Sequence, residues 1–347
     1  MNLHVERVRP ASDREWDRAW YDCDYATFFH GREWAELWQV YTRGRVRPAP
    51  RVVELSDRTT VLLPLSHQRD WNGERYFSSL AYTYGGWISS ADLGPEHARV
   101  LSELLRREFG GIVWRLNPYD PCVPTLRLPT CQPDTTHVLD LSLGLAALRR
   151  RWTRSHRSAE NQARRFGISV RRASTRSDWE RYYELYQSTL ARWGDSATSR
   201  YGQRLFRAMA RRNSPDVGLW LAEAPGVGPV AGTVALYSRN HVIVWHGVAL
   251  AEYFPLRPAN LLYVEVMKHG EAAGYRWFDF NPSGGHAGVE AFKRSFGAEE
   301  RICPLVFLEP RRGRVAAVFR RLTQMIARFG SSAKKAGEAT GTATGVQ

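Results

Sequence analysis

Lysine and cysteine are scarce in this 347-residue sequence, and long apolar runs are missing. The four cysteines (Cys23, Cys122, Cys131 and Cys303) form no C-x-x-C pair, which excludes a disulfide framework and a zinc site of the usual spacing. Residues 1–16 lack the apolar core of a signal peptide, and no stretch of about 18 apolar residues is present to span a membrane. We therefore expect a metal-free cytoplasmic protein, with the inner membrane surface as the alternative location.

The positive charge is concentrated in two parts of the chain. The sequence contains 45 arginines but only four lysines, and its formal net charge is +14. Residues 145–176 contribute +9 and residues 311–347 contribute +7, so the rest of the chain is close to neutral. Two basic elements on a near-neutral body predict a polyanionic partner such as RNA, nucleotide phosphates or an anionic membrane; solvated helix faces are the alternative.

The hydrophobic pattern of the second half predicts helices, a three-stranded meander, and then alternating helices and strands. A strand–helix–strand unit favours parallel pairing through a right-handed crossover. An antiparallel meander that leads into such a unit is the build of GNAT acyltransferases. The predicted helices are 145–166, 178–192, 201–211, 258–274 and 288–296, and the predicted strands are 168–172, 217–223, 230–237, 242–248, 277–281 and 302–308.

The first half has a less regular version of the same order of helices and strands. It begins with a capping box of Ser12 and Glu15, which predicts the start of a helix. We therefore predict the α/β (α+β) class, with two tandem GNAT-like domains that each contain a mixed sheet flanked by helices. The length suits about two domains. The predicted boundaries are 1–143 for the acceptor-side domain, 144–310 for the acyl-transfer domain, 311–330 for a basic amphipathic helix and 331–347 for a disordered tail.

The segment WFDFNPSGGHAGVEAFKRSFGAEE, residues 277–300, resembles the closing signature of the FemAB-like transferases. The preceding LRPANLLYVEVMKHGEAAGYR also resembles this family, as do SHRSAENQARRFGISVRRA and, more weakly, FFHGREWAEL and YTYGGWIS in the first half. The resemblance covers about residues 28–308. It implies tandem GNAT-like domains and transfer of an amino acid from aminoacyl-tRNA to an amine, which in well-known members belongs to a peptidoglycan precursor.

The resemblance also implies a catalytic role for Phe292 and Lys293, which match the Phe-Lys pair at the aminoacyl ester. A lysine ammonium can approach a developing oxyanion as a point charge. Asn281 lies at the end of the predicted strand and could orient a water or the amine, with Asp279 and Ser283 beside it on the acceptor side. The alternatives are that Phe292 is a core residue and that the Asn-Pro-Ser-Gly-Gly run only forms a turn.

The predicted donor site lies at the start of the helix at residues 258–274. A CoA-binding loop needs glycines there, but the sequence has Arg257 and Asn260 around Pro258 and Ala259, which counts against CoA. Arg257 could bind one phosphate. We assign the basic face of the helix at residues 145–166 to the same donor, through Arg150, Arg154, Arg157 and Arg164.

The predicted acceptor site in the first domain consists of Tyr82, Tyr84, Gly86 and Trp87, an aromatic and glycine-containing loop after a strand. Packing between the domains is the alternative role for Tyr84 and Trp87. The expected function is aminoacyl transfer from aminoacyl-tRNA to an amine of a cell-envelope precursor or small metabolite, by a monomer with no bound cofactor. Acetyl-CoA-dependent N-acetyl transfer is the first alternative, and non-catalytic binding of RNA or a membrane surface is the second.

Overall fold

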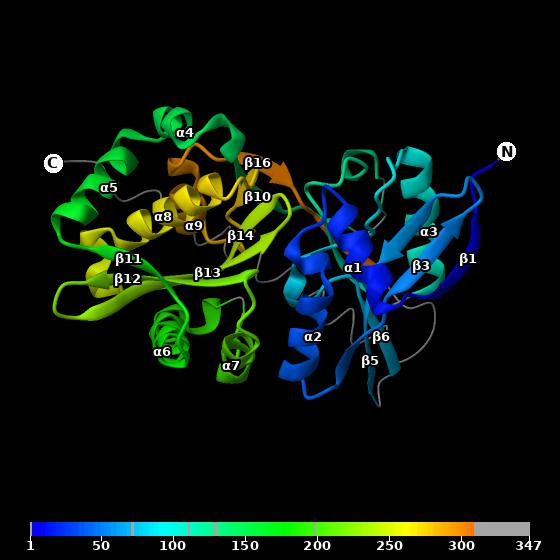
Figure 1. Cartoon of the computed structure of the whole chain (residues 1–347), viewed down its shortest axis with the longest axis horizontal. Helices are drawn as coiled ribbons and strands as arrows, with labels where there is room; N and C mark the ends of the chain where they lie inside the picture. The colour runs from blue at the N-terminus through cyan, green and yellow to red at the C-terminus, as the bar shows by residue number, and fades with distance from the viewer. Residues whose placement is uncertain are drawn as a thin grey trace.

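The computed structural model describes residues 2–70, 73–109, 112–126, 128, 131–197 and 199–308. The predicted basic helix at 311–330 and tail at 331–347 lie outside the described residues. The described chain forms two lobes, with the first half of the sequence in one and most of the second half in the other (Figure 1). Both lobes contain a mixed sheet flanked by helices, which confirms the predicted fold class.

Two sheets form the first lobe. The smaller sheet has the order β1-β3-β4, and the larger has the order β2-β5-β6-β8-β17-β9, with β7 paired to β8. Parallel pairing of β6 and β7 with β8 makes the larger sheet mixed. The strands are β1 (Val5–Pro10), β2 (Val46–Pro48), β3 (Arg51–Leu55), β4 (Thr60–Leu63), β5 (Ser66–Asp70), β6 (Gly73–Phe77), β7 (Tyr84–Gly85), β8 (Ile112–Leu116), β9 (Cys131–Gln132) and β17 (Leu305–Leu308).

The sheet of the second lobe has the order β11-β12-β13-β14-β15-β10-β16. Its pairings are antiparallel except that of β14 with β15, which are joined through helix α8 as the predicted crossover requires. The strands are β10 (Thr135–Asp140), β11 (Ser169–Ala173), β12 (Val217–Ala224), β13 (Gly228–Ser238), β14 (His241–Ala249), β15 (Trp277–Asp279) and β16 (Glu299–Ile302).

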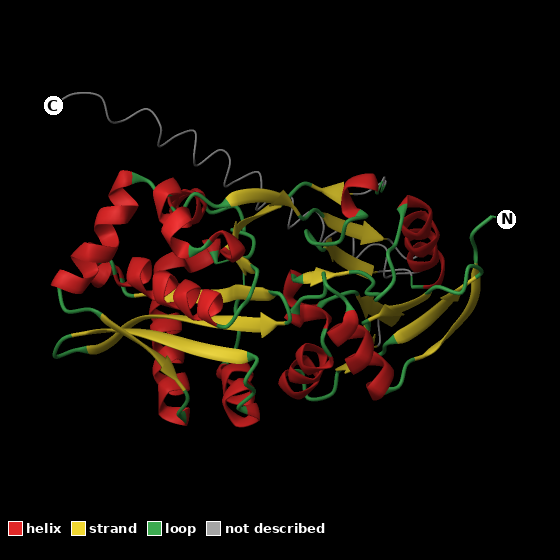
Figure 2. Cartoon of the chain, turned by 45° about the horizontal axis from the view of Figure 1, so that its top comes forward, coloured by secondary structure: helices red, strands yellow, loops and turns green. Residues whose placement is uncertain are grey.

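Helices cover both faces of this second sheet. Helix α8 packs against β12 and β13 on one face, with α5 against it, whereas α6 packs against β13 and β14 on the other (Figures 1 and 2). Buried apolar residues fill both layers. The helices are α1 (Asp13–Asp22), α2 (Arg32–Tyr41), α3 (Pro95–Glu108), α4 (Leu145–Arg151), α5 (Arg154–Arg165), α6 (Arg176–Trp193), α7 (Gln203–Arg212), α8 (Pro258–Ala272) and α9 (Ala287–Ser295), and the 3-10 turns are η1 (Phe28–His30), η2 (Leu80–Tyr82), η3 (Val123–Thr125), η4 (Leu141–Leu143), η5 (Gly194–Ser196) and η6 (Ala251–Leu256).

The two lobes exchange strands. Strand β10, which the predicted junction at 143/144 assigns to the first domain, pairs with β15 and β16 of the second sheet. Strand β17, assigned to the second domain, pairs with β8 and β9 of the first sheet. The strand predicted at 302–308 is accordingly two strands, separated at Cys303 and Pro304. The chain therefore crosses between the lobes twice, before β10 and after β16, which are neighbours at one edge of the second sheet.

The prediction of one continuous helix at 145–166 is wrong, because the structure divides this segment into α4 and α5. Trp152 is extended (φ −65°, ψ 145°), and Thr153 caps α5 by accepting a hydrogen bond from the His156 amide at 3.3 Å. The Thr153 amide donates to the Ser295 carbonyl at 3.0 Å, so α9 takes the bond that a continuous helix would use. Phe166, expected on the apolar stripe, follows the end of α5 and is 45% exposed.

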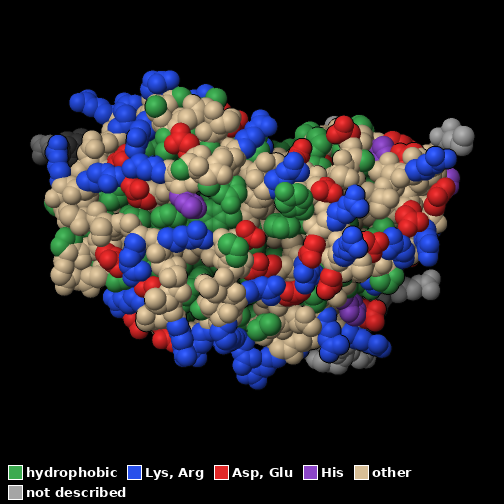
Figure 3. All heavy atoms as spheres, in the orientation of Figure 1, with side chains coloured by type: hydrophobic (Ala, Val, Ile, Leu, Met, Phe, Trp, Pro, Cys, Tyr) green, Lys and Arg blue, Asp and Glu red, His purple; other side chains and the backbone are tan. Residues whose placement is uncertain are grey.

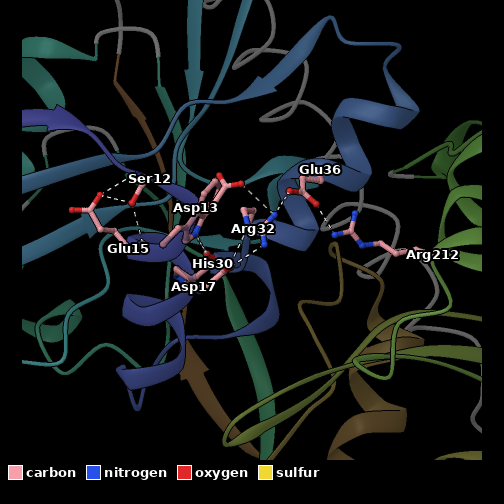
Figure 4. A network of polar contacts seen from close by, with 9 residues as sticks. Ser12, Asp13, Glu15, Asp17, His30, Arg32, Glu36 and Arg212 are labelled. Carbon is pink, nitrogen blue, oxygen red and sulfur yellow. Dashed lines mark hydrogen bonds and ion pairs between the residues drawn. The ribbon is translucent and has the colours of Figure 1, made fainter.

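Ion pairs and aromatic rings join the lobes. Arg212 of α7 contacts Glu36 of α2 at 2.5 Å, and Glu36 in turn contacts Arg32 at 2.6 Å (Figure 4). Beside them, the buried Trp34 ring meets Trp245 of β14. One hydrophobic cluster thus continues from the first lobe into the second.

Candidate active site

Lys293 is a buried cation of the second lobe. It lies on α9 with 4% of its surface exposed. Its ammonium donates to the backbone carbonyl of Asn281 and, at 2.9 Å, to the Ser283 hydroxyl. An ammonium has three N–H donors, so these contacts leave one donor for another partner.

The lysine's partners come from the loop that follows β15. Strand β15 ends at Asp279, opposite Ile243, whereas its parallel neighbour β14 continues to Ala249. Asn281 has a left-handed backbone (φ 59°), a conformation that asparagine tolerates, and this turns its carbonyl toward Lys293. Its side-chain amide donates to the Trp245 carbonyl of β14 at 3.5 Å. The loop therefore bridges the two strands where β15 ends, an edge at which open α/β sheets place ligands.

Asp279 is fully buried and accepts four hydrogen bonds. The Tyr84 and Tyr119 hydroxyls donate to its Oδ2, each at 2.9 Å. The Thr136 hydroxyl donates to Oδ1 at 2.6 Å, and the Asn281 amide donates to the same oxygen at 2.7 Å. Burial raises the pKa of this carboxyl, and the donors oppose that rise. Asp279 thus joins residues of both lobes. Each of its two carboxylate oxygens accepts two hydrogen bonds from groups of the protein itself.

Burial also shifts the protonation of Lys293. Removal of the ammonium from water lowers its pKa to about 8, and the nearby Asp279 opposes this shift. At pH 7 the group is therefore mostly charged, yet it can lose a proton within about one pH unit. A buried amine with this proton affinity is suited to electrostatic stabilisation and to proton exchange.

Phe292 lies in an aromatic cluster with a histidine that the sequence analysis did not single out. His156 of α5 is 2% exposed and packs against Phe296 with the two rings tilted by 50° and their centroids 3.7 Å apart. The Phe292 ring centroid lies 6.2 Å from that of His156. Burial lowers the pKa of His156 to about 4, so the ring is neutral at pH 7. The signal for its burial was its position four residues after Trp152 on the predicted apolar stripe.

The start of α8 touches the same cluster. The Asn260 amide nitrogen lies 2.9 Å from His156 Nδ1. Arg257 is exposed and left-handed (φ 59°) at the N-cap of α8. The predicted donor residue Asn260 is therefore part of the packing around α9, whereas Arg257 has its side chain in solvent.

The four arginines predicted for the donor lie on two helices. Arg150 is exposed on α4, and Arg154 begins α5. Arg157 donates to the Trp152 carbonyl at 2.9 Å, across the break between the helices. Arg164 contacts Glu265 of α8 at 2.5 Å, so its charge is paired. Figure 3 shows basic side chains gathered in the region of α4 and α5, but they do not share one continuous helix face.

The predicted acceptor residues of the first domain separate into two groups. Tyr84 reaches Asp279, and Tyr82 is 43% exposed on a left-handed turn. Trp87 is 1% exposed in the core of the first lobe, with its ring 5.1 Å from Trp114. Gly86 (φ 120°) lies against the Trp114 ring, since an added Cβ would come within 3.1 Å of the indole nitrogen of Trp114. The structure thus brings Tyr84, Asp279, Asn281, Ser283 and Lys293 together, and leaves Gly86 and Trp87 in the core.

Tyr119 and Thr136 belong to this site and were missed from the sequence. Tyr119 follows a proline in an irregular segment. Thr136 lies on β10, which pairs in the sheet of the second lobe although the predicted boundary assigns it to the first domain. No local pattern therefore marked either residue. Within the described ranges, no group of three or more His, Cys, Asp or Glu side chains could hold a metal ion. No helix among the described residues is long and apolar enough to cross a membrane.

Comparisons with known proteins agree with this architecture. Residues 148–294 match the acetyltransferase (GNAT) domain family. The chain is similar to the crystal structure of FemX (12% identity, TM-score 0.63), with 87% of this chain and 98% of FemX covered. It is also similar to L-PGS from Bacillus licheniformis (13% identity, TM-score 0.50, 84% and 92% covered) and to a conserved protein of unknown function from Bacteroides thetaiotaomicron (11% identity, TM-score 0.51, 86% and 99% covered).

No curated protein matches the sequence. The structural likenesses extend over most of this chain and most of each neighbour, and at these identities they show the fold. The GNAT match includes Lys293, Asn281 and Asp279. Residues 148–294 therefore match the GNAT domain family, and the chain as a whole shares the two-domain fold of FemX, as the sequence resemblance implied.

Proposed function

We propose that this protein transfers an aminoacyl group from aminoacyl-tRNA to the amine of a cell-envelope precursor or small metabolite. The observation that carries the proposal is the buried Lys293 ammonium at the end of β15, inside the GNAT domain. The fold shared with FemX and L-PGS supports aminoacyl transfer, and the GNAT domain supports an acyltransferase in general.

In this reaction the acceptor amine forms a bond to the ester carbonyl carbon, and the bond from that carbon to the tRNA ribose oxygen breaks. Negative charge develops on the carbonyl oxygen, and the amine loses a proton while the leaving oxygen gains one. Lys293 would stabilise the oxyanion through its remaining N–H donor. Its pKa of about 8 also permits a proton to pass through the ammonium. Phe292 would pack beside the acyl group or the terminal adenine.

The other predicted residues would hold the two substrates. Arg257 and the exposed Arg150, Arg154 and Arg157 would bind the tRNA acceptor end, since phosphate contacts supply most non-specific affinity for nucleic acid. Tyr82 would lie on the acceptor side. Asn281 would orient the amine, because its Oδ1 is buried with no described hydrogen-bond partner. Contact of the 311–330 segment with an anionic membrane and a monomeric state remain part of the proposal.

A second candidate donor is acetyl-CoA, favoured by the match to an acetyltransferase family. Against it, α8 begins Arg257-Pro258-Ala259-Asn260, without the glycines that let amides close on a pyrophosphate. Proline has no N–H, and Asn260 contacts His156. The beginning of α8 therefore offers fewer free donors than a CoA loop.

The two donors can be separated in one assay. Purified protein is incubated with candidate amines and either charged total tRNA or acetyl-CoA, and products are identified by mass spectrometry. The proposal predicts product with charged tRNA and none after RNase treatment. Product that needs acetyl-CoA and survives RNase would replace the tRNA donor with a thioester. A Lys293→Met variant tests whether either product depends on the site.

A further inference from the structure

We propose that Asp279 is a positioning residue that couples the first lobe to Lys293. The inference rests on the proposed role of Lys293 and extends it. The Asp279 carboxylate lies on the second sheet and is held by two hydroxyls of the first lobe. The same carboxylate fixes the loop that binds Lys293, which gives the two-lobed architecture a role at the site.

The four partners of Asp279 all act as donors. Tyr84 belongs to β7 and Tyr119 follows β8, so both of the Oδ2 contacts come from the first lobe. Thr136 and the Asn281 amide supply the Oδ1 contacts. A carboxylate that accepts four hydrogen bonds is satisfied in its ionised form, whereas a protonated carboxyl would leave one contact without an acceptor. The geometry therefore favours a buried negative charge at this point.

The link from Asp279 to Lys293 is a single peptide segment. The Asn281 amide donates to Asp279, and the carbonyl of the same residue accepts from the Lys293 ammonium. Movement of the first lobe that pulls Tyr84 and Tyr119 from the carboxylate would loosen Asn281 and, with it, one of the two described partners of the lysine. Acceptor binding in the first lobe is thereby connected to the position of the cation.

Other charged and titratable groups near Lys293 are less suited to this role. Asp134 is paired with Arg115 at 2.6 Å, and Glu290 on α9 lies 3.8 Å from Arg294. Burial raises the pKa of Cys303 to about 12, so the thiol is neutral, and burial lowers the pKa of His137, which favours its neutral form. Asp279 is completely buried, and its described contacts are all uncharged donors.

The test is a direct titration of Lys293 in the full chain. Because the chain has four lysines, protein carrying 13C-labelled lysine gives few Cε signals, and a Lys293→Arg variant assigns the one of interest. The midpoint expected for the unaltered protein is about pH 8. Asp279→Asn should lower this midpoint by about one pH unit, a tenfold change in proton affinity, because a neighbouring anion is lost.

The Tyr84→Phe/Tyr119→Phe double variant should change the midpoint in the same direction by a smaller amount, since it weakens the ionised form of Asp279 without removing it. Tyr237→Phe is the matched control: it removes a buried hydroxyl that accepts from Trp220 at 2.9 Å, away from this cluster, and should leave the midpoint unchanged. If Asp279→Asn fails to fold, the double Phe variant provides the same comparison.

An unchanged midpoint in a folded Asp279→Asn protein, or an equal change in the Tyr237→Phe control, overturns the coupling. Because the titration needs no substrate, its result does not depend on the proposed donor. Loss of the proposed function would appear separately, as a Lys293→Met protein that retains full transfer activity.

Discussion

The indole of Trp34 in α2 meets the indole of Trp245 in β14 edge to face, with ring centroids 5.3 Å apart. Trp34 is 1% exposed and its contact joins the cores of the two lobes. We expect Trp34→Ala to lower the free energy of unfolding by about 3–5 kcal/mol, the usual effect of truncating a buried aromatic ring. Urea denaturation measures this change in the free energy of unfolding. Tyr21→Ala is the control, because the Tyr21 side chain is 67% exposed. A loss as small as the control's would show that the lobes are stable without this contact.

The ion pairs beside this contact should be weaker. Arg212→Ala removes contacts with Glu36 at 2.5 Å and Glu33 at 3.2 Å, and the side chains are 19–35% exposed. We expect a loss of about 1 kcal/mol in the free energy of unfolding, because solvent screens such pairs. A double-mutant cycle with Glu36→Gln isolates the pair, and its coupling should decrease at high salt. A coupling that does not depend on salt would contradict the electrostatic assignment.

Acid should destabilise the fold through its buried histidines. Burial lowers the pKa of His30 to about 4 and that of His241 and His246 to about 3, against 6.5 when exposed. Between pH 6.5 and about 3 the unfolded chain binds more protons than the folded chain, so stability present above pH 6.5 is lost as the pH falls. We expect a decrease of about 2 kcal/mol or more between pH 7 and pH 5.

Urea denaturation across this pH range measures the effect. His241→Phe should flatten the pH dependence, because the ring that must gain a proton on unfolding is gone. His4→Gln, at an exposed position, is the control and should leave the slope unchanged. Equal slopes in the His241→Phe and unaltered proteins would contradict the assignment to this ring.

The basic side chains on α4 and α5 should affect tRNA binding as a charge effect. Arg150→Gln/Arg154→Gln should weaken binding of charged tRNA several-fold and reduce the slope of log affinity against log salt by about 1–2. Arg106→Gln/Arg107→Gln on α3 removes the same charge from exposed positions of the first lobe and is the matched control. Equal losses in both double variants would mean that these arginines contribute only to the net charge.

Local sequence signals predicted much of this fold. The Ser12–Glu15 capping box is present at the start of α1, and the crossover through α8 joins parallel strands as predicted. These features depend on residues close in sequence or on a handedness rule that holds for nearly every such connection. The GNAT-like second lobe could therefore be anticipated from its element order together with the family resemblance.

The features that were not predicted depend on distant contacts. The break between α4 and α5 arises because the Thr153 amide bonds Ser295 and because Gly297 lies so close to Arg151 that an added Cβ would come within 2.7 Å of it. The exchange of β10 and β17 between sheets depends on pairings more than 140 residues apart along the chain. For the same reason the contacts of Asp279 were not predicted, although two of its partners, Tyr84 and Asn281, were predicted as site residues.

The measurement that tests the central claim most directly is the single-turnover rate of aminoacyl transfer from charged tRNA by Lys293→Met and Lys293→Arg. Each variant is compared with the unaltered protein at equal folded concentration. If the buried ammonium stabilises the oxyanion, Lys293→Met should lose about 100-fold or more in rate, and Lys293→Arg should recover only part of it, because a guanidinium does not match the contacts with Asn281 and Ser283. A Lys293→Met protein that folds normally and transfers the aminoacyl group at the unaltered rate would contradict the account.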